Sequence, residues 1–476
     1  MTLEADICYQ AVLTRDARFD GVFFVGISTT GIYCRTVCPA KRPRRESCTF
    51  YPSAAAAEQA GFRPCLRCRP ELAPGNARID AVSRLAAATV NRIEDGALAD
   101  MSVEELAAEM GISDRHLRRV INSEFGVSLI ELAQTQRLLL AKRLLTDTNL
   151  TVTEVAFASG FSSLRRFNAL FKERYRLNPT NLRQVRSPEI PQETLLCEVA
   201  YRPPLNWDAL LSFLVRRASC GVEAIDGDRY LRTVAWKKHR GWIAVEPSKK
   251  KHTLRVELSA ALAPVLLPTL TRVKRLFDLA AEPQQIAVHL GPLAAAHPGL
   301  RVPGAFDGFE MAVRAIIGQQ VSVKAATTLA GRFVTAFGEP IKTPFAQLTH
   351  LPPVAERVAT AEPEELVAIG ITLVRAKSIL ALARAVLEEK LILEPGADAQ
   401  QTIMRLKELP GIGDWTAQYV AMRALSWPDA FPHTDLGIYK ALAENNPKRV
   451  LQLAESWRPW RSYAAMHLWK SLETTL

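Results

Sequence analysis

The spacing of apolar and polar residues changes along the chain, and each change marks a structural boundary. From Ala77 to about residue 186, apolar residues recur with the spacing of amphipathic helices, beginning with ARIDAVSRLAAATVNRI. From residue 195 to about 300, the apolar runs LLCEVAYRPP, YLRTVAWKKHRGWIAVEPS and HTLRVELS predict strands, here mixed with helices. Helical spacing returns at about residue 306. The pattern therefore predicts a multidomain, mainly α protein with one α+β portion.

These changes of pattern give a domain division. A polar, proline-bearing stretch, SPEIPQE, separates the first helical region from the α+β portion. The length of 476 residues, at roughly 100 to 200 residues per domain, also favours several domains. We expect a cysteine-rich module at 1–76, a helical domain at 77–186, a linker at 187–194, an α+β domain at 195–305 and an all-α domain at 306–476.

Two features of composition restrict the location and the partners of the protein. No stretch approaches the ~18 uninterrupted apolar residues of a membrane helix, and the N-terminal segment carries acids where a signal peptide has an apolar core. We therefore expect a cytoplasmic protein without a membrane partner. The 60 Lys and Arg residues exceed the 49 Asp and Glu residues, so the net charge is +11 and favours a polyanionic partner, nucleic acid first.

Six of the eight cysteines lie within the first 68 residues. Cys34-x3-Cys38 and Cys65-x2-Cys68 form two close pairs, which is the spacing of a four-cysteine zinc site. Two disulfides are the alternative, but an intracellular chain favours bound metal over disulfides. On spacing alone, the zinc could be purely structural. The two other cysteines of this module lie outside the pattern, and we expect them to be buried thiols.

The neighbourhood of the first cysteine pair indicates chemistry beyond a structural role. The stretch from Arg35 to Arg45 contains five basic residues and no acid, so a zinc thiolate here would lie on a surface that binds DNA phosphates. The net negative charge of four thiolates on one zinc ion keeps sulfur electron-rich and able to attack an alkyl group. The basic residues are Arg35, Lys41, Arg42, Arg44 and Arg45.

The segment FFVGISTTGIYCRTVCPAKRPRRESCTFYPSAAAAEQAGFRPCLRCRPE resembles the N-terminal domain of the Ada family of bacterial adaptive-response proteins, at all four cysteines. The resemblance implies that Cys34 accepts a methyl group irreversibly from a methylphosphotriester of the DNA backbone. It also implies that Cys38, Cys65 and Cys68 are the remaining zinc ligands. Methylation would remove one negative charge from a site facing phosphates, so DNA affinity should rise.

Two segments of the helical middle share one pattern. The first starts at Ser102 with a Ser-x-x-Glu capping box and turns at Gly111, and the second starts at Thr151 and turns at Gly160. With a joining helix at about Leu129 to Leu145, they resemble the AraC-type DNA-binding domain. The resemblance implies promoter binding in successive major grooves, transcription activation and contact with RNA polymerase. The residues presented to bases or phosphates would be Arg115, His116, Arg118, Arg119, Ser163, Arg165, Arg166 and Asn168.

The most informative motif of the C-terminal half is LPGIGDWTA, at residues 409–417. A Leu-Pro-Gly-x-Gly turn between two helices exposes backbone N–H groups that hold a DNA phosphate, here at Gly411 and Gly413. Asp435 follows this motif and precedes the next helix. A hairpin followed by such an aspartate resembles the helix-hairpin-helix glycosylase superfamily. Trp415 stands where bifunctional members carry a lysine, so a lyase step is disfavoured.

The chemistry of base excision explains the need for one acid. Cleavage of an N-glycosidic bond builds positive charge on the sugar, which a carboxylate such as Asp435 stabilises. An alkylated base is already cationic and leaves without being protonated. Asp414 and Asp429 are competing acids, but the first lies in the hairpin and the second is better placed to cap a helix or turn. Aromatic residues such as those near Asp435 usually belong to the hydrophobic core. However, a cationic base that is flipped out of the duplex needs electron-rich ring faces on which to stack, so these aromatics would have a use in base binding.

The span from Leu195 onwards resembles the AlkA family, 3-methyladenine DNA glycosylase II, through YRPPLNW, LSAALAPV, RLFDLAAEPQQI, PGLRVPGAFDGFE, RAIIGQQVSV, LPGIGDWTAQY and WRPWRSYAAMHLW. The resemblance implies Asp435 as the catalytic aspartate and a monovalent cation at the hairpin carbonyls near Leu409, Gly411 and Ile412. Gln320 replaces the apolar residue that wedges into the duplex in this family. The base-pocket aromatics implied by the resemblance are Phe213, Trp415, Tyr419 and Trp469.

Together these features predict one chain that senses methylphosphotriesters, activates transcription and excises 3-methyladenine and 7-methylguanine from alkylated double-stranded DNA. The Pro-Cys-His-Arg motif of O6-alkylguanine transferases is absent, so repair by that route is not expected. Two alternatives stay open: a regulator whose glycosylase fold is catalytically silent, and a glycosylase whose zinc module only targets it to DNA. We expect a bacterial, nucleoid-associated monomer.

Overall fold

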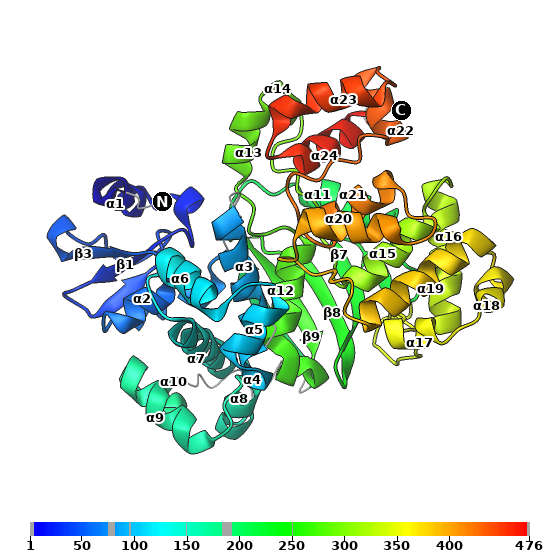
Figure 1. Ribbon diagram of the computed structural model, residues 1–476. Helices are drawn as coiled ribbons and strands as arrows, with labels where there is room; N and C mark the ends of the chain where they lie inside the picture. Colours follow the sequence, from blue (N-terminus) through cyan, green and yellow to red (C-terminus); the bar gives the residue numbers. More distant parts are fainter. Residues whose placement is uncertain are drawn as a thin grey trace. The chain divides into compact units, whose positions relative to one another are not determined.

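The computed structural model describes residues 4–74, 81–94, 97–148, 150–182, 193–249 and 251–473 (Figure 1). The chain forms two compact units, which are described separately. The helices and the two small sets of strands confirm the multidomain, mainly α class. None of the helices in the described ranges combines the length and the apolar character that a membrane crossing requires. Unit 1 comprises Met1–Pro203, Ser248–Thr271 and Leu279–Glu282, and unit 2 comprises Pro204–Pro247, Arg272–Asp278 and Pro283–Leu476.

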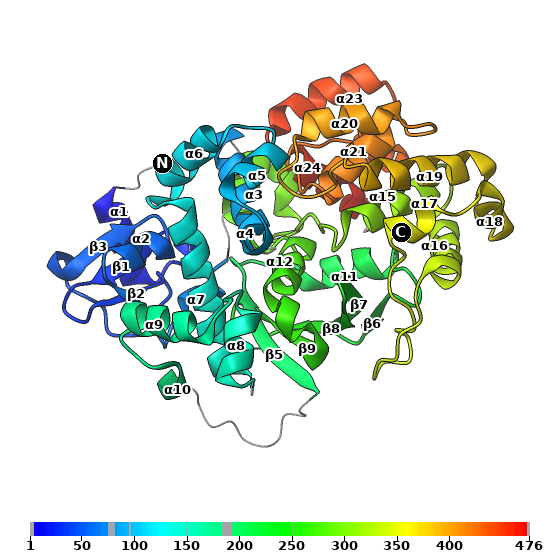
Figure 2. The same cartoon turned by 60° about the horizontal axis from the view of Figure 1, so that its bottom comes forward.

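A small four-stranded sheet carries the cysteine-rich module of unit 1. The strand order is β3-β1-β2-β4, with β1 antiparallel to both neighbours and β4 parallel to β2. Helix α2 packs against this sheet (Figure 2), and Ser53 caps the helix by accepting a hydrogen bond from the Ala56 backbone. Cys8 and Cys48 are buried thiols of the module's core, as predicted. The sequence pattern does not predict these strands, because they are too short to show alternation. The elements are α1 (Ala5–Thr14), β1 (Phe24–Ile27), β2 (Ile32–Cys34), β3 (Cys48–Tyr51), α2 (Ala54–Gln59) and β4 (Arg63–Pro64).

Two helix pairs joined by a long helix follow in unit 1, as the sequence predicts. Left-handed glycines make both turns, Gly111 with φ 70° and Gly160 with φ 79°. A capping box forms at Ser102, as predicted, and another forms at Thr151. Residues 187–192 of the predicted linker lie outside the described residues. The elements are α3 (Ala81–Glu94), α4 (Ala97–Asp100), α5 (Val103–Glu109), α6 (Asp114–Phe125), the joining helix α7 (Leu129–Asp147), α8 (Val152–Ala158), α9 (Leu164–Tyr175) and α10 (Pro179–Leu182).

A buried glutamate joins the cysteine-rich module to these helices. Glu58, on α2, accepts hydrogen bonds from the hydroxyls of Tyr33 at 3.0 Å and Tyr175 at 3.3 Å. The Thr135 hydroxyl donates to the other carboxyl oxygen at 3.2 Å. Because these partners belong to β2, α9 and α7, the Glu58 contact ties four elements together. Burial raises the pKa of Glu58 to about 7 even though the hydroxyl donors lower it.

The predicted α+β stretch supplies strands to both units. In unit 1, β5 pairs antiparallel with β9, with Thr194 opposite Ser259. In unit 2, β6, β7 and β8 form an antiparallel meander. The sequence pattern predicts β5, β7, β8 and β9 but not β6, which is short and only partly buried. The elements are β5 (Thr194–Ala200), α11 (Trp207–Val215), β6 (Glu223–Asp226), β7 (Arg229–Trp236), β8 (His239–Pro247), β9 (Thr253–Ser259), α12 (Leu266–Leu276), α13 (Pro283–Leu290) and α14 (Pro292–Ala295).

Helices build the rest of unit 2, as predicted from about residue 306 onwards. Helix α15 contacts α19 and α21, and α20 packs on α21 (Figure 1). Ile316, Ile379 and Val420 of these helices are fully buried, so the core lies between them. The elements are α15 (Gly308–Ile317), α16 (Val323–Phe337), α17 (Ala355–Ala359), α18 (Pro363–Ala368), α19 (Leu373–Leu387), α20 (Ala399–Glu408), α21 (Asp414–Arg423), α22 (Leu436–Leu442), α23 (Pro447–Ala454) and α24 (Arg461–Ser471).

The substitution Glu58→Gln tests the Glu58 contact. The wild-type carboxyl binds its proton more tightly in the folded state, with a pKa of about 7 against an ordinary 4.5. Glu58 should therefore contribute about 3 kcal/mol to the loss of wild-type stability as pH rises from 4 to 8, and the amide, which does not titrate, should remove this contribution. Urea unfolding followed by circular dichroism at several pH values measures the difference. Glu46→Gln, at an exposed position, is the control, and equal pH dependence in Glu58→Gln and wild type would contradict the prediction.

Candidate active site and metal centre

The four cysteines that the sequence analysis pairs come together in space. Cys34 ends β2, and Cys65 and Cys68 follow β4, so the small sheet sets their separation. All four sulfurs lie within 4.8 Å of one another, with Cys38 Sγ and Cys65 Sγ 4.0 Å apart, and none forms a disulfide. Tetrahedral zinc with Zn–S bonds of 2.3 Å places its sulfurs roughly 3.8 Å apart. The cluster therefore fits Zn2+. Cys34 is 4% exposed, and Cys38 is the least buried of the four.

Hydrogen bonds surround the sulfurs of the cluster. The Arg35 backbone N–H donates to Cys68 Sγ at 3.4 Å, and the Arg35 guanidinium donates to the Cys68 carbonyl at 3.1 Å. The hydrogen bond from Cys34 lowers the pKa of Cys38 to about 7, whereas the hydrogen bond to Cys38 raises the pKa of Cys34. Arg35 itself is buried and paired with Asp20. The sequence analysis predicts that Arg35 contacts DNA, but its guanidinium binds Asp20 and the Cys68 carbonyl inside the module.

The other predicted phosphate-binding residues of the module lie at its surface. Arg42 and Arg44 are exposed. Arg45 is half-buried, with its guanidinium 5.5 Å from the centre of the Phe50 ring and 3.3 Å from an Asp6 carboxylate oxygen. An exposed ion pair of this length contributes little to stability, so Asp6 does not prevent Arg45 from contacting a phosphate. The basic stretch thus presents Arg42 and Arg44 fully, and Arg45 in part, to solvent.

The predicted DNA-contacting arginines of the helical middle are on the second helix of each pair, α6 and α9. All five are exposed. On α6, Arg118 pairs with Glu104 at 2.8 Å, and Arg119 donates to a ring nitrogen of His116 at 2.9 Å. The two helices therefore carry basic surfaces, as a helix that enters a major groove requires. The arginines are Arg115, Arg118, Arg119, Arg165 and Arg166.

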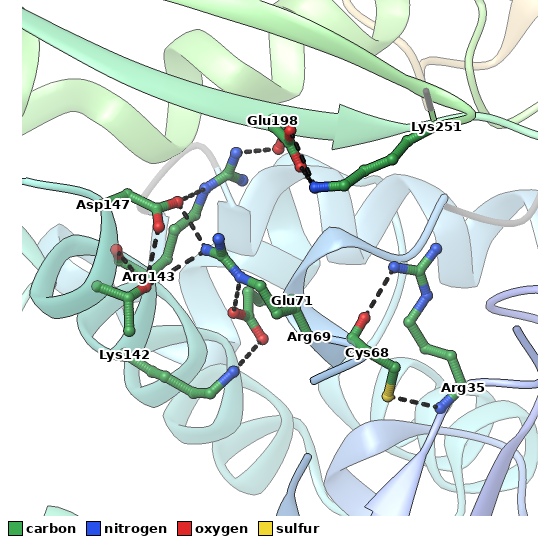
Figure 3. A network of polar contacts seen from close by, with 10 residues as sticks. Arg35, Cys68, Arg69, Glu71, Lys142, Arg143, Asp147, Glu198 and Lys251 are labelled. Carbon is green, nitrogen blue, oxygen red and sulfur yellow. Dashed lines mark hydrogen bonds and ion pairs between the residues drawn. The ribbon is translucent and has the colours of Figure 1, made fainter. Parts of the chain in front are cut away.

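An ion-pair network connects the cysteine cluster to α7 (Figure 3). Arg69, directly after Cys68, pairs with Asp147 at 2.6 Å and with Glu71 at 3.1 Å. Glu71 also pairs with Lys142 at 2.6 Å. Although burial alone would raise the pKa of Glu71, the two neighbouring cations lower it. Sequence reasoning missed this network, because the partners are far apart in the chain and no local pattern relates them.

The hairpin motif forms the turn between α20 and α21. Gly411 has φ 74°, and a Cβ there would lie 2.5 Å from Ser378 Oγ, so the turn requires glycine. Gly413 caps α21 and is exposed, with open space where a Cβ would be. The Gln319 amide donates to the Gly411 carbonyl at 2.9 Å and to the Thr416 hydroxyl at 3.0 Å, which fixes the turn. The exposed start of α21 suits an approaching phosphate.

Asp435 caps α22 and holds its carboxylate among four N–H donors. Oδ1 accepts from the backbones of Gly437 at 2.8 Å and Ile438 at 3.1 Å, and from Trp469 Nε1 at 2.8 Å. Oδ2 accepts from Trp415 Nε1 at 2.8 Å. The four hydrogen bonds therefore fix the carboxylate in position. Its two indole donors come from α21 and α24.

The four predicted pocket aromatics lie next to one another in one group. Trp415 and Tyr419 are parallel, with an interplanar angle of 6° and ring centroids 5.3 Å apart. Trp469 lies 6.1 Å from Tyr419 and 6.4 Å from Phe213, centroid to centroid. Asp435 and the rings of Trp415, Tyr419 and Trp469 line a cavity of about 1090 Å³ in unit 2. Phe213 packs behind Trp469.

Other acids near the motif have different partners. Asp414 pairs with Lys407 at 3.1 Å and lies 3.4 Å from His433. Asp429 is buried and pairs with Arg461 at 2.7 Å, rather than capping a helix. Neither acid lines the cavity that contains Asp435. Of the three aspartates considered from the sequence, Asp435 is the one that lines the cavity.

The sequence reasoning named some residues of the cavity and missed others. Gln320, at the expected wedge position, is exposed, has φ 50° and lines the cavity. Four arginines also line it, and no motif singles them out, because they lie far apart in the chain. They are Arg217, Arg232, Arg314 and Arg423.

Sequence profiles of four families match successive parts of the chain. Their order agrees with the resemblances found in the sequence. The profiles describe the metal binding domain of Ada at residues 7–71, a helix-turn-helix domain at 106–184, the AlkA N-terminal domain at 196–307 and the HhH-GPD superfamily base excision DNA repair protein at 313–457.

Individual relatives cover the chain in part or almost entirely. DNA-3-methyladenine glycosylase 2 of Escherichia coli is 40% identical over 56% of this chain and 95% of its own length. The solved 3-methyladenine DNA-glycosylase of Archaeoglobus fulgidus, at 21% identity and a TM-score of 0.50, shares the fold over 57% of this chain and 97% of its own. The probable bifunctional transcriptional activator/DNA repair enzyme AlkA of Mycobacterium tuberculosis is 37% identical over 481 residues, or 98% of this chain and 96% of that protein. The chain therefore belongs to the family of bifunctional transcriptional activator/DNA repair enzymes of the AlkA type.

Proposed function

We propose that unit 2 is a monofunctional DNA glycosylase that releases 3-methyladenine and 7-methylguanine from alkylated double-stranded DNA. One observation carries this proposal: two indole N–H groups hold the Asp435 carboxylate at the wall of an aromatic cavity. A fixed anion beside stacked rings suits a reaction that builds positive charge on a sugar while a flat, cationic base departs.

The arrangement assigns a role to each group. The bond from C1′ to the base nitrogen breaks and its electron pair stays on the base, so positive charge develops on the sugar beside Asp435. Because four N–H donors already surround this carboxylate, it acts as a fixed counter-charge more than as a proton acceptor. Water then adds to C1′ and loses a proton to solvent. Trp415, in place of a lysine, offers no amine for a lyase step.

The aromatic group and the hairpin would position the DNA. The rings of Trp415, Tyr419 and Trp469 offer faces for a flipped base, with Phe213 supporting Trp469. The backbone at Gly413 and the start of α21 would hold a phosphate, and Gln320 would occupy the gap left in the duplex. We also propose that the hairpin carbonyls bind a monovalent cation.

We further propose that the cysteine-rich module is a methylphosphotriester sensor with a four-cysteine Zn2+ site. Bound zinc would keep the sulfurs deprotonated. Cys34 Sγ would form a bond to the methyl carbon as the carbon–oxygen bond breaks, and the DNA would leave as an ordinary phosphodiester anion. The phosphate would be held by Arg42, Arg44 and Arg45. Because Cys34 is buried, the loop around it must open to admit the DNA backbone.

The proposed regulatory function uses the helix pairs of unit 1. Helices α6 and α9 would bind promoter DNA through their exposed arginines, and the bound protein would contact RNA polymerase. We propose that the protein acts as a monomer in the bacterial cytoplasm, associated with the nucleoid. The domain limits proposed are those given by the sequence pattern. A catalytically silent glycosylase fold is the alternative, and the fixed Asp435 argues against it.

Asp435→Asn should abolish most base release. Removing the counter-charge while keeping the side-chain shape should slow release of 3-methyladenine and 7-methylguanine by at least about 100-fold. Single-turnover assays on methylated duplex DNA measure these rates, and a gel-shift assay checks DNA binding. Asp226→Asn, at an exposed position on β6 that does not line the cavity, is the matched control and should keep near wild-type rates. Unchanged release by Asp435→Asn, or an equal loss in both variants, would refute the assignment of Asp435.

Methyl transfer to the sensor should be visible by mass. Incubation with DNA that carries methylphosphotriesters should add about 14 Da to the wild type, and peptide mapping should place this mass on Cys34. Cys34→Ser should show no adduct, whereas Cys48→Ser, at a thiol outside the cluster, should react normally. An adduct on the more exposed Cys38 would move the acceptor to that residue. No adduct on a zinc-loaded wild type would favour a purely structural metal.

A further inference from the structure

A short connection between α15 and α16 carries a strained residue at the rim of the cavity. Residues 318–322 form this connection, which begins after Ile317 and ends where Ser322 caps α16. Gln320, within it, has φ 50°, a left-handed conformation that costs free energy in a residue with a Cβ. The residue is exposed, and it lines the cavity. Strained residues persist only where neighbouring contacts hold them, and they gather at functional sites.

Gln319 holds this connection in place. Its side-chain amide donates to the Gly411 carbonyl at 2.9 Å and to the Thr416 hydroxyl at 3.0 Å, so both amide hydrogens have an acceptor. Its backbone carbonyl accepts a hydrogen bond from the guanidinium of Arg375. Gln319 therefore joins the hairpin turn, the first turn of α21 and α19, and the backbone of Gln320 follows directly from it.

Helix α19 fixes the hairpin turn as well as the connection. Ser378 is fully buried, and its hydroxyl donates to the Pro410 carbonyl at 2.6 Å. Arg375, which binds the Gln319 carbonyl, precedes Ser378 by three positions and lies on the same face of the helix. The carbonyls of Pro410 and Gly411 are thus each bound by a side chain from another element. The hairpin turn and the connection are therefore held together by one set of contacts.

Gln319 lies between the parts of the site that would act on DNA. Gly413, at the start of α21, would hold a phosphate, and Gln320 would fill the gap that a flipped base leaves in the duplex. Trp415, which donates to Asp435, directly precedes the threonine that Gln319 binds. Each of these residues lines the cavity. The contacts of Gln319 therefore set the separations among the phosphate site, the gap-filling residue and the aromatic wall.

Base flipping gives these separations a use. Breaking a base pair and unstacking the base cost free energy, and the base returns to the duplex unless another group occupies its place. A side chain can resist that return only if its backbone is held in place relative to the DNA. The hairpin supplies a fixed point on the DNA through a bound phosphate, and Gln319 connects this fixed point to Gln320.

We propose that Gln319 is a positioning residue that holds Gln320 at a set distance from the phosphate at the hairpin and thereby keeps the flipped base out of the duplex. This proposal rests on the glycosylase function proposed above and deepens it, because it concerns the step before bond cleavage. Gln319 should therefore matter most for a lesion held in a base pair. It should matter little for a lesion with no partner base, since flipping such a base costs less free energy.

Single-turnover release of 7-methylguanine from two duplexes tests this proposal. The duplexes differ only at the position opposite the lesion, which is cytosine in one and a tetrahydrofuran abasic-site analogue in the other. Gln319→Met keeps the side-chain length but removes both N–H donors. It should slow release about 10-fold opposite cytosine and less than about twofold opposite the analogue. Gln401→Met, at an exposed position on α20 that does not line the cavity, is the control and should leave both rates unchanged.

A double variant tests whether Gln319 acts through Gln320. If it does, Gln319→Met should add little to the loss that Gln320→Ala causes, because the two changes remove the same effect. Gln320→Ala alone should also slow release more opposite cytosine than opposite the analogue. Additive losses in the double variant would contradict the proposal. Thr416→Val removes the hydroxyl that Gln319 binds and should shift the ratio of the two rates in the same direction, so it serves if Gln319→Met does not fold.

The remaining outcomes separate this proposal from the glycosylase function. Equal slowing on both duplexes would mean that Gln319 supports the cavity itself, and unchanged rates would mean that its contacts are dispensable. Either result would overturn the positioning role while leaving the glycosylase function intact. A wild type that releases the base from neither duplex would refute both. Thermal unfolding followed by circular dichroism checks that each variant compared is folded.

Discussion

The carboxylate of Asp435 is the anion on which the architecture of unit 2 depends. A partly buried carboxylate is stable only where donors satisfy it. Here the donors are the first backbone N–H groups of α22 and the indoles of Trp415 and Trp469, so α21, α22 and α24 must meet at this point. The hairpin turn before α21 and the stack of Trp415 on Tyr419 follow from the same meeting. The contacts that hold these helices together are therefore also the contacts that fix the Asp435 carboxylate in the cavity wall.

Charged side chains of both signs line the cavity that contains Asp435. Glu223 and Glu310 both pair with Arg232, whereas Asp435 accepts hydrogen bonds from uncharged N–H groups. Within the described residues, the Asp435 carboxylate is therefore satisfied by hydrogen bonds and not by a cationic partner.

Unit 1 follows a different principle, because its parts are joined by buried polar contacts. Glu58 links the small sheet to α7 and α9, and the pairs of Arg69 and Glu71 link the end of the cysteine cluster to α7. Helix α7 in turn joins the two helix pairs that carry the basic surfaces. Buried polar contacts tolerate little displacement, since an unsatisfied charge is costly. These contacts therefore connect the cysteine cluster, through α7, to the helices that carry the basic surfaces.

The sequence alone determined the order of domains, most helices and strands, the four-cysteine cluster, the glycine turns and the position of Asp435. These features depend on local backbone requirements or on short spacings, which a sequence displays directly. Tertiary structure alone decided that Arg35 is buried against Asp20, that Trp415 and Trp469 both donate to Asp435, and that four arginines line one cavity. Those contacts join residues distant in the chain, and local periodicity reports that a side chain is buried without reporting which partner it meets.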